Sequence, residues 1–167
     1  MSHSVTITRT TTTTTSTAII LNTGYLKTAS GLLKLAQTIL GAVCIGLVGA
    51  NINTRYGGIL INLTEVLFFL LMVTAFFITT FCLLVSSLMS FVTASMIHKT
   101  VFEVMYHVVA FALLLAAGIV LLIELKDHEG RQYYNACLAA AIIGLVNSAL
   151  YLLSTIFAVR TYKGAGL

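Results

Sequence analysis

Long stretches without a charged side chain constrain this sequence more than any other feature. Four of them lie between charged residues and contain 20, 33, 20 and 28 residues: 35–54, 66–98, 104–123 and 132–159. A helix needs about 20 apolar residues to cross the roughly 30 Å of hydrocarbon in a bilayer. Each stretch therefore holds one membrane span and none holds two, so the sequence predicts four transmembrane helices.

The amino-acid composition excludes a soluble globular domain. Of the 167 residues, 59% are hydrophobic and 8% are charged, whereas about a quarter of an average soluble domain is charged. The chain contains no proline, which argues against the proline-kinked helices of many transporters. Because no connection between the spans is long enough to fold by itself, we expect the function to reside in the bundle, its lipid-facing surface or the chain ends.

The expected fold class is all-α: a four-helix transmembrane bundle with cytosolic N- and C-termini. The expected spans are about 32–50, 64–90, 101–123 and 136–159. The second charge-free stretch is longer than one upright span requires, so its helix either tilts or extends out of the bilayer. The connections, including Phe91–Thr100, are expected to be short loops.

The chain ends are expected to be cytosolic tails. Residues 1–24 are polar and rich in threonine, and they cannot bury enough apolar surface to fold, which predicts a disordered tail. Phosphorylation of this tail stays open, as does glycosylation of the sequon at Asn62, which lies close to the membrane surface. Residues 25–163 form the expected four-span domain, and 164–167 form a short second tail.

The basic residues predict the orientation of the bundle. Six of the nine fall on one side of the expected topology: Arg9, Lys27, Lys34, Lys99, Arg160 and Lys163. Cytosolic loops carry the excess of Lys and Arg, so this side, with both termini, is placed in the cytosol. A net charge of +4 concentrated there suits anionic lipids. Since no basic cluster exceeds two residues, a nucleic-acid partner is not expected.

Small residues recur at helical spacing in three of the spans and are candidate helix-packing positions, because small side chains let helices approach closely. They are Ala42, Gly46 and Ala50 in the first span, Ala112 and Ala116 in the third, and Ala136, Ala140, Gly144 and Ser148 in the fourth. The second span is rich in phenylalanine instead. We expect it to pack against the other helices through these large side chains, or to face lipid. The same small residues would also suit contact between copies of the chain.

Few polar side chains fall inside the spans. Gln37 and Asn147 are amides, which need a hydrogen-bond partner in hydrocarbon. Glu103 and His107 lie four residues apart on one helical face, with Lys99 four residues before Glu103, and we interpret these three as a cluster at the cytosolic membrane surface. The alternative is a small channel or transporter subunit that uses Glu103, His107 and Asn147.

No sequence pattern predicts catalysis, a cofactor or a metal ion. Cys44, Cys82 and Cys137 all fall inside spans, where a free cysteine behaves as a small apolar residue. No Cys and His set has the spacing of a zinc site. A membrane enzyme would need several polar groups at one depth, and only Glu103 and His107 qualify. We therefore expect neither an enzyme nor a small-molecule substrate.

Two segments resemble the MARVEL-domain family of small four-span proteins. The entry to the first span, Ser30–Gly41, combines a basic and glycine-containing start with a leucine-rich stretch that includes Gln37. The last span, Tyr134–Arg160, is similar to the last span of the plasmolipin and chemokine-like factor branch. The resemblance covers about residues 27–163, and the short loops favour this branch over claudins, tetraspanins and MARVEL proteins with longer outer loops.

The resemblance implies a non-enzymatic membrane organiser. Such proteins are associated with lipid-raft microdomains, membrane apposition, vesicle trafficking, and junction or myelin membranes. The implied location is the plasma membrane or vesicle membranes. The implied partners are membrane lipids, including sterol-rich domains, and other membrane proteins or further copies of the chain. The family has no catalytic residues to transfer to this sequence.

Overall fold

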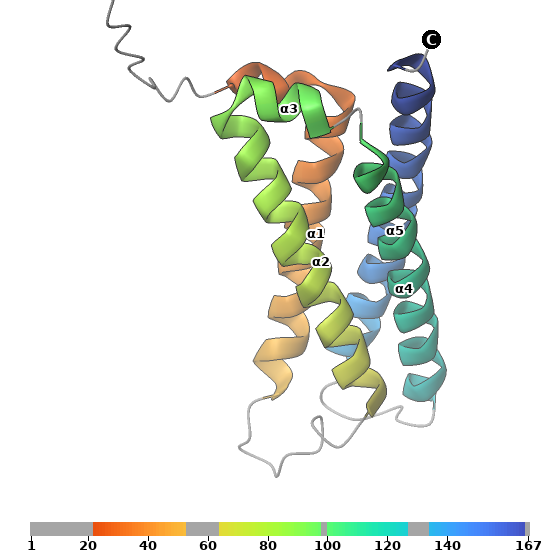
Figure 1. Cartoon of the computed structure of the whole chain (residues 1–167). Helices are drawn as coiled ribbons and strands as arrows, with labels where there is room; N and C mark the ends of the chain where they lie inside the picture. The colour runs from red at the N-terminus through yellow and green to blue at the C-terminus, as the bar shows by residue number, and fades with distance from the viewer. Residues whose placement is uncertain (1–21, 53–63, 98–99, 127–133, 166–167) are drawn as a thin grey trace, which may run out of the picture.

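The computed structural model describes residues 22–52, 64–97, 100–126 and 134–165. Within these ranges four long helices form the bundle: α1 (Ala29–Ile52), α2 (Thr64–Met89), α4 (Val101–Leu125) and α5 (Tyr134–Ala165). Two short helices accompany them, η1 (Thr23–Lys27) and α3 (Phe91–Ile97). The expected all-α, four-helix architecture is confirmed (Figure 1). Most of the expected tail at 1–24, the sequon at Asn62 and Lys99 lie outside the described residues.

Each long helix is long and apolar enough to cross a membrane. α5 is the longest, with 32 residues, or about 48 Å at 1.5 Å per residue. It continues six residues beyond the expected end at 159 because nothing in Arg160–Ala165 interrupts a helix; this stretch contains no proline. The added turn and a half carries Arg160, Tyr162 and Lys163, all exposed, as expected for a segment that emerges from the bilayer.

The connection between α2 and α4 differs from the expected loop. α2 ends at Met89, and α3 follows after Ser90, lying across the end of the bundle (Figure 1). The backbone N–H of Thr93 donates to the Ser90 hydroxyl at 3.2 Å, which is the hydrogen bond of a serine N-cap. Ala94 of α3 packs with Tyr25 of η1 and Leu84 of α2, and this small apolar cluster stabilises both short helices.

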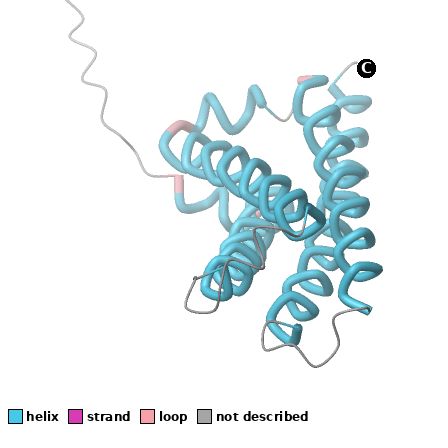
Figure 2. The backbone as a smooth tube through the Cα atoms, turned by 90° about the horizontal axis from the view of Figure 1, so that it is seen from below, coloured by secondary structure: helices cyan, strands magenta, loops and turns pink. Residues whose placement is uncertain are grey.

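The long helices pack in the order α1, α2, α4, α5 around the bundle axis. α1 contacts α2 and α5, and α4 contacts the same two helices; Figure 2 shows the arrangement along the axis. The described chain begins and ends at the same end of the bundle, where α1 starts and α5 finishes (Figure 1). We call this the α3 end, because α3 lies across it.

The inward faces of α1 and α4 differ from the expected ones. Ala42, Gly46 and Ala50 of α1 are exposed, and a Cβ added at Gly46 would meet no atom within 4 Å. Ala112 and Ala116 of α4 are exposed as well. The inward positions are others: Cys44 and Val48 in α1, and Ala110, Leu114, Ala117 and Leu121 in α4.

Close helix contacts occur at α5. Ala140, Gly144 and Ser148 are buried and Ala136 is half-buried. Gly144 lies directly against the ring of Phe69 in α2, so that a Cβ there would come within 2.7 Å of the ring. A second close approach joins Gly118 of α4 to Leu145 of α5, and the sequence pattern did not identify it because Gly118 does not belong to the Ala112–Ala116 stripe.

Candidate functional site

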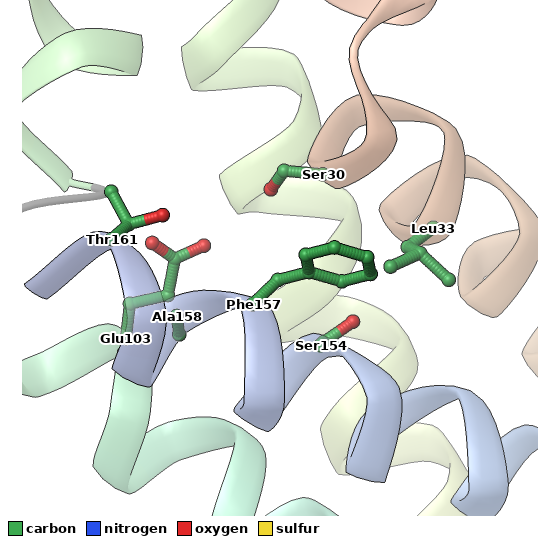
Figure 3. Close-up of a pocket in the computed structure, with 7 residues that line it drawn as sticks. All are labelled: Ser30, Leu33, Glu103, Ser154, Phe157, Ala158 and Thr161. Atoms are coloured by element: carbon green, nitrogen blue, oxygen red, sulfur yellow. The ribbon is translucent and has the colours of Figure 1, made fainter. Parts of the chain in front are cut away.

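A small cavity lies between α1 and α5 near the α3 end. Its volume is about 20 Å³, and its wall combines polar and apolar groups from three helices: Ser30, Leu33, Glu103, Ser154, Phe157, Ala158 and Thr161. The Glu103 carboxylate extends toward the cavity from α4 (Figure 3). A cavity of this size accepts one water molecule, for which about 10–15 Å³ of such volume is enough.

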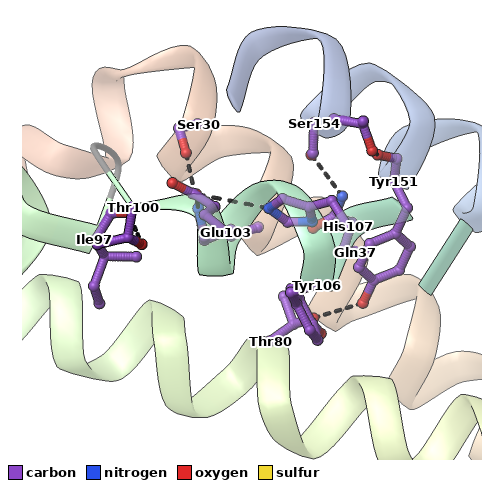
Figure 4. A network of polar contacts seen from close by, with 12 residues as sticks. Ser30, Gln37, Thr80, Ile97, Thr100, Glu103, Tyr106, His107, Tyr151 and Ser154 are labelled. Carbon is purple, nitrogen blue, oxygen red and sulfur yellow. Dashed lines mark hydrogen bonds and ion pairs between the residues drawn. The ribbon is translucent and has the colours of Figure 1, made fainter. Parts of the chain in front are cut away.

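A buried ion pair joins α1 to α4 beside this cavity. The ammonium group of Lys34 contacts Oε1 of Glu103, and the two side chains are 1% and 2% exposed. Lys34 Nζ also donates to the Ser30 hydroxyl at 2.9 Å. His107, one helical turn beyond Glu103, places Nε2 3.6 Å from the same Glu103 oxygen (Figure 4). This distance is longer than a normal hydrogen bond, but it is that of an ion pair when the imidazole is protonated.

The ion pair differs from the cluster expected at the membrane surface. Glu103 and His107 are both buried inside the bundle, and the cation beside Glu103 comes from a helix 69 residues away in the chain. Lys34 looked like a basic residue at the entry to the first span. A signal for its inward position was present, however, because Ser30, Lys34 and Gln37 are spaced four and three residues apart and so share one helical face.

The two intramembrane amides join α1 to α5. Gln37 Nε2 donates to the Ser154 hydroxyl at 2.8 Å, and Asn147 Nδ2 donates to the backbone carbonyl of Gln37 at 3.3 Å. All three residues are buried. Among the described residues, the amide oxygens Gln37 Oε1 and Asn147 Oδ1 have no hydrogen-bond partner.

A third group of hydroxyls joins α2, α4 and α5. The Thr80 hydroxyl lies 2.6 Å from the Tyr106 hydroxyl and 2.5 Å from the Tyr151 hydroxyl. Tyr106 donates to the carbonyl oxygen of Phe76 at 3.1 Å. Both tyrosine rings also pack on His107, with centroid separations of 5.1 and 5.8 Å. The sequence patterns did not reveal this group, although Thr80 is a polar residue within a strongly apolar span.

These polar groups occupy only one half of the bundle. The buried polar side chains of the described residues run from the α3 end to about the middle of the long helices: Lys34, Gln37, Thr80, Ser87, Glu103, His107, Asn147, Ser148 and Ser154. We call this region the polar half. The opposite half has an apolar core that includes Val48, Phe69 and Leu121, together with the buried free cysteines Cys44 and Cys137. Cys82 is exposed.

The outer surface of the bundle is apolar along all four long helices. Large hydrophobic side chains are more than 40% exposed on each of them, including Ile39, Leu71, Ile123 and Ile142. No group of three or more His, Cys, Asp and Glu side chains in the described part of the chain is placed to hold a metal ion. An apolar outer surface on four helices of spanning length, with the buried polar side chains paired inside the bundle, defines a multi-pass integral membrane protein.

Comparison with known families agrees with this class. The model of the membrane-associating domain named MARVEL matches residues 25–157, from η1 into the last part of α5. The chain therefore belongs to the MARVEL family. No curated protein and no solved structure matched it.

Proposed function

We propose that the protein is a non-enzymatic organiser of membranes that acts through its lipid-facing surface. The observation that carries this proposal is the difference between the outward and the inward faces of the helices. The exposed side is apolar over the length of the bundle, whereas the buried polar groups hydrogen-bond or pair with one another between helices. Its partners are membrane lipids, including sterol-rich domains, and other membrane proteins or further copies of the chain.

The proposed orientation places the α3 end in the cytosol, with both termini. Three exposed basic residues of the described chain, Lys27, Arg160 and Lys163, lie at this end, as the positive-inside rule requires of the cytosolic side. The proposed locations are the plasma membrane and vesicle membranes. Within the family we assign the chain to the plasmolipin and chemokine-like factor branch, because the α1–α2 and α4–α5 connections are short.

Helix length provides the physical basis for lipid sorting. α2 has 26 residues and α4 has 25, or about 37–39 Å each at 1.5 Å per residue. These lengths exceed the hydrocarbon thickness of an average bilayer, about 30 Å. Mismatch costs fractions of a kcal/mol per Å and sorts proteins toward thicker membranes. Thick, sterol-rich domains therefore favour this bundle.

We expect the purified protein to enter the thicker phase when it is reconstituted into phase-separated giant vesicles. The measurement is the ratio of labelled protein between the two phases. Two series of experiments separate the effect of bilayer thickness from the effect of sterol. One series varies acyl-chain length without sterol, and the other varies the sterol content at constant thickness. Equal partition in both series would contradict lipid sorting.

The channel alternative receives less support from the geometry. Glu103, His107 and Asn147 all lie in the polar half, and the core of the opposite half is apolar among the described residues. Glu103 is also engaged with Lys34. A conducting path needs polar groups or water along the whole span, so we favour the membrane organiser.

A further inference from the structure

We propose that the cavity between α1 and α5 is a water site through which Lys34, Glu103 and His107 exchange protons with one side of the membrane. The side is the one at the α3 end. We call these three residues the proton-binding cluster. This proposal is independent of lipid sorting, because it concerns the interior of the bundle and not its surface.

The cavity has the size and the lining of a water site. Its volume of about 20 Å³ accommodates one water, which needs two to four polar partners. The wall supplies the Glu103 carboxylate and three hydroxyls, those of Ser30, Ser154 and Thr161 (Figure 3). Thr161 is exposed and belongs to the last two turns of α5, so the cavity lies next to the water at the α3 end.

The cluster contains one side chain of the type that ordinarily changes charge near neutral pH, the imidazole of His107. The Lys34 ammonium and the Glu103 carboxylate form a pair of zero net charge. The His107 imidazole lies 3.6 Å from the same carboxylate oxygen, and histidine changes charge between about pH 5 and about pH 8. Glu103 lines the cavity and lies beside His107, so a proton from a hydronium ion at the water site binds the Glu103 carboxylate and then passes to the imidazole. The hydronium ion becomes water, no covalent bond between heavy atoms changes, and the cluster gains one positive charge.

The groups around His107 determine how favourable it is for the imidazole to take up this proton. Glu103 attracts the added charge, and Lys34 of α1 opposes it across the shared carboxylate. Tyr106 of α4 and Tyr151 of α5 place their rings against the imidazole, and Thr80 of α2 bonds both tyrosine hydroxyls. The polar half thus surrounds the imidazole with one carboxylate, one ammonium and neutral hydroxyls.

Proton exchange is restricted to one side by the opposite half of the bundle. Beyond Asn147 the described core consists of apolar side chains and cysteines, including Cys44, Val48 and Leu114. A proton that enters from the α3 end finds no chain of donors and acceptors there to continue across. The cluster therefore senses the pH of one compartment without conducting protons to the other.

The first measurement is nuclear magnetic resonance of the full chain with labelled histidine, in liposomes of defined orientation. The chain has four histidines, and loss of one signal in His107→Gln assigns the buried one. We expect the chemical shift of this signal to change reversibly, from that of a neutral imidazole to that of a protonated one, as the pH at the α3 end falls from about 8 to about 5. The same change on the opposite side leaves it unaltered. A constant signal, or an equal response to both sides, would overturn the proposal.

The second measurement tests the route, as the rate at which the His107 ring proton exchanges with water. Ala158→Val adds two carbon atoms to the wall of the cavity and is expected to slow exchange at least tenfold. The matched control is Ala149→Val, on the exposed face of the same helix, which leaves the rate unchanged. If Ala158→Val alters the helix content, Thr161→Val removes a lining hydroxyl at nearly constant volume and gives the same expected slowing. Unchanged exchange in a folded cavity variant excludes this route.

Discussion

Replacing Glu103 by alanine is expected to destabilise the bundle by about 3–5 kcal/mol, since it leaves the Lys34 ammonium buried without its carboxylate. Lys34 and Glu103 are 1% and 2% exposed, so neither charge is open to bulk solvent where it lies. Lys34→Ala is expected to have a similar effect for the same reason. Unfolding of the purified protein in detergent, followed by circular dichroism, measures both.

A double replacement tests whether the charge or the space is responsible. Lys34→Met combined with Glu103→Leu removes both charges and keeps most of the volume. A buried pair replaced by apolar residues of similar size is often neutral or stabilising. We therefore expect the double variant to recover the stability of the parent protein. Glu65→Ala, at the half-buried first turn of α2, serves as a control and is expected to lose less than about 1 kcal/mol. A double variant as unstable as Glu103→Ala would contradict this account of the pair.

Gly144→Val is expected to have the second largest effect. A Cβ at Gly144 would come within 2.7 Å of the Phe69 ring, and Phe69 is fully buried, so the ring cannot move aside into free space. Overpacking of this kind costs about 1–3 kcal/mol, and sometimes more. The measurement is again the unfolding transition in detergent.

The same substitution at Gly46 is the matched control. Gly46 lies in α1, and a Cβ there would meet nothing within 4 Å. Because valine is a better helix former than glycine, Gly46→Val is expected to fold with unchanged or slightly higher stability. Combining Gly144→Val with Phe69→Leu should recover part of the loss, since the two sites are in contact. Equal losses at Gly46 and Gly144 would show that the Phe69 contact is not the cause.

The number of long helices could be predicted because charge is so costly in hydrocarbon that its absence marks each span. The faces of the helices were harder to predict. Small residues indicate where helices can approach, but lipid tolerates them as well, and Ala42, Gly46 and Ala112 accordingly lie outside. The polar residues are the better guide, since Ser30, Lys34 and Gln37 share the inward face of α1.

The partner of Glu103 could not be read from local spacing. Helical periodicity relates only residues three or four positions apart, and by this criterion Lys99 was the expected neighbour of Glu103. Lys34 is 69 residues away in the chain. Which helix lies next to which is decided by packing across the bundle, and the sequence pattern carries no direct signal of it. The contact between Thr80, Tyr106 and Tyr151 depends on the same long-range packing.

The position of the ion pair has a consequence for the order of assembly during synthesis. Lys34 belongs to the first long helix and Glu103 to the third, so α1 and α2 emerge from the ribosome before the carboxylate exists. Until then we expect the ammonium to reach the membrane surface through its long side chain, because Lys34 lies only five residues into α1. When α4 inserts, we expect the ammonium to move into the bundle and pair with Glu103. The ion pair then fixes the position of α1 relative to α4.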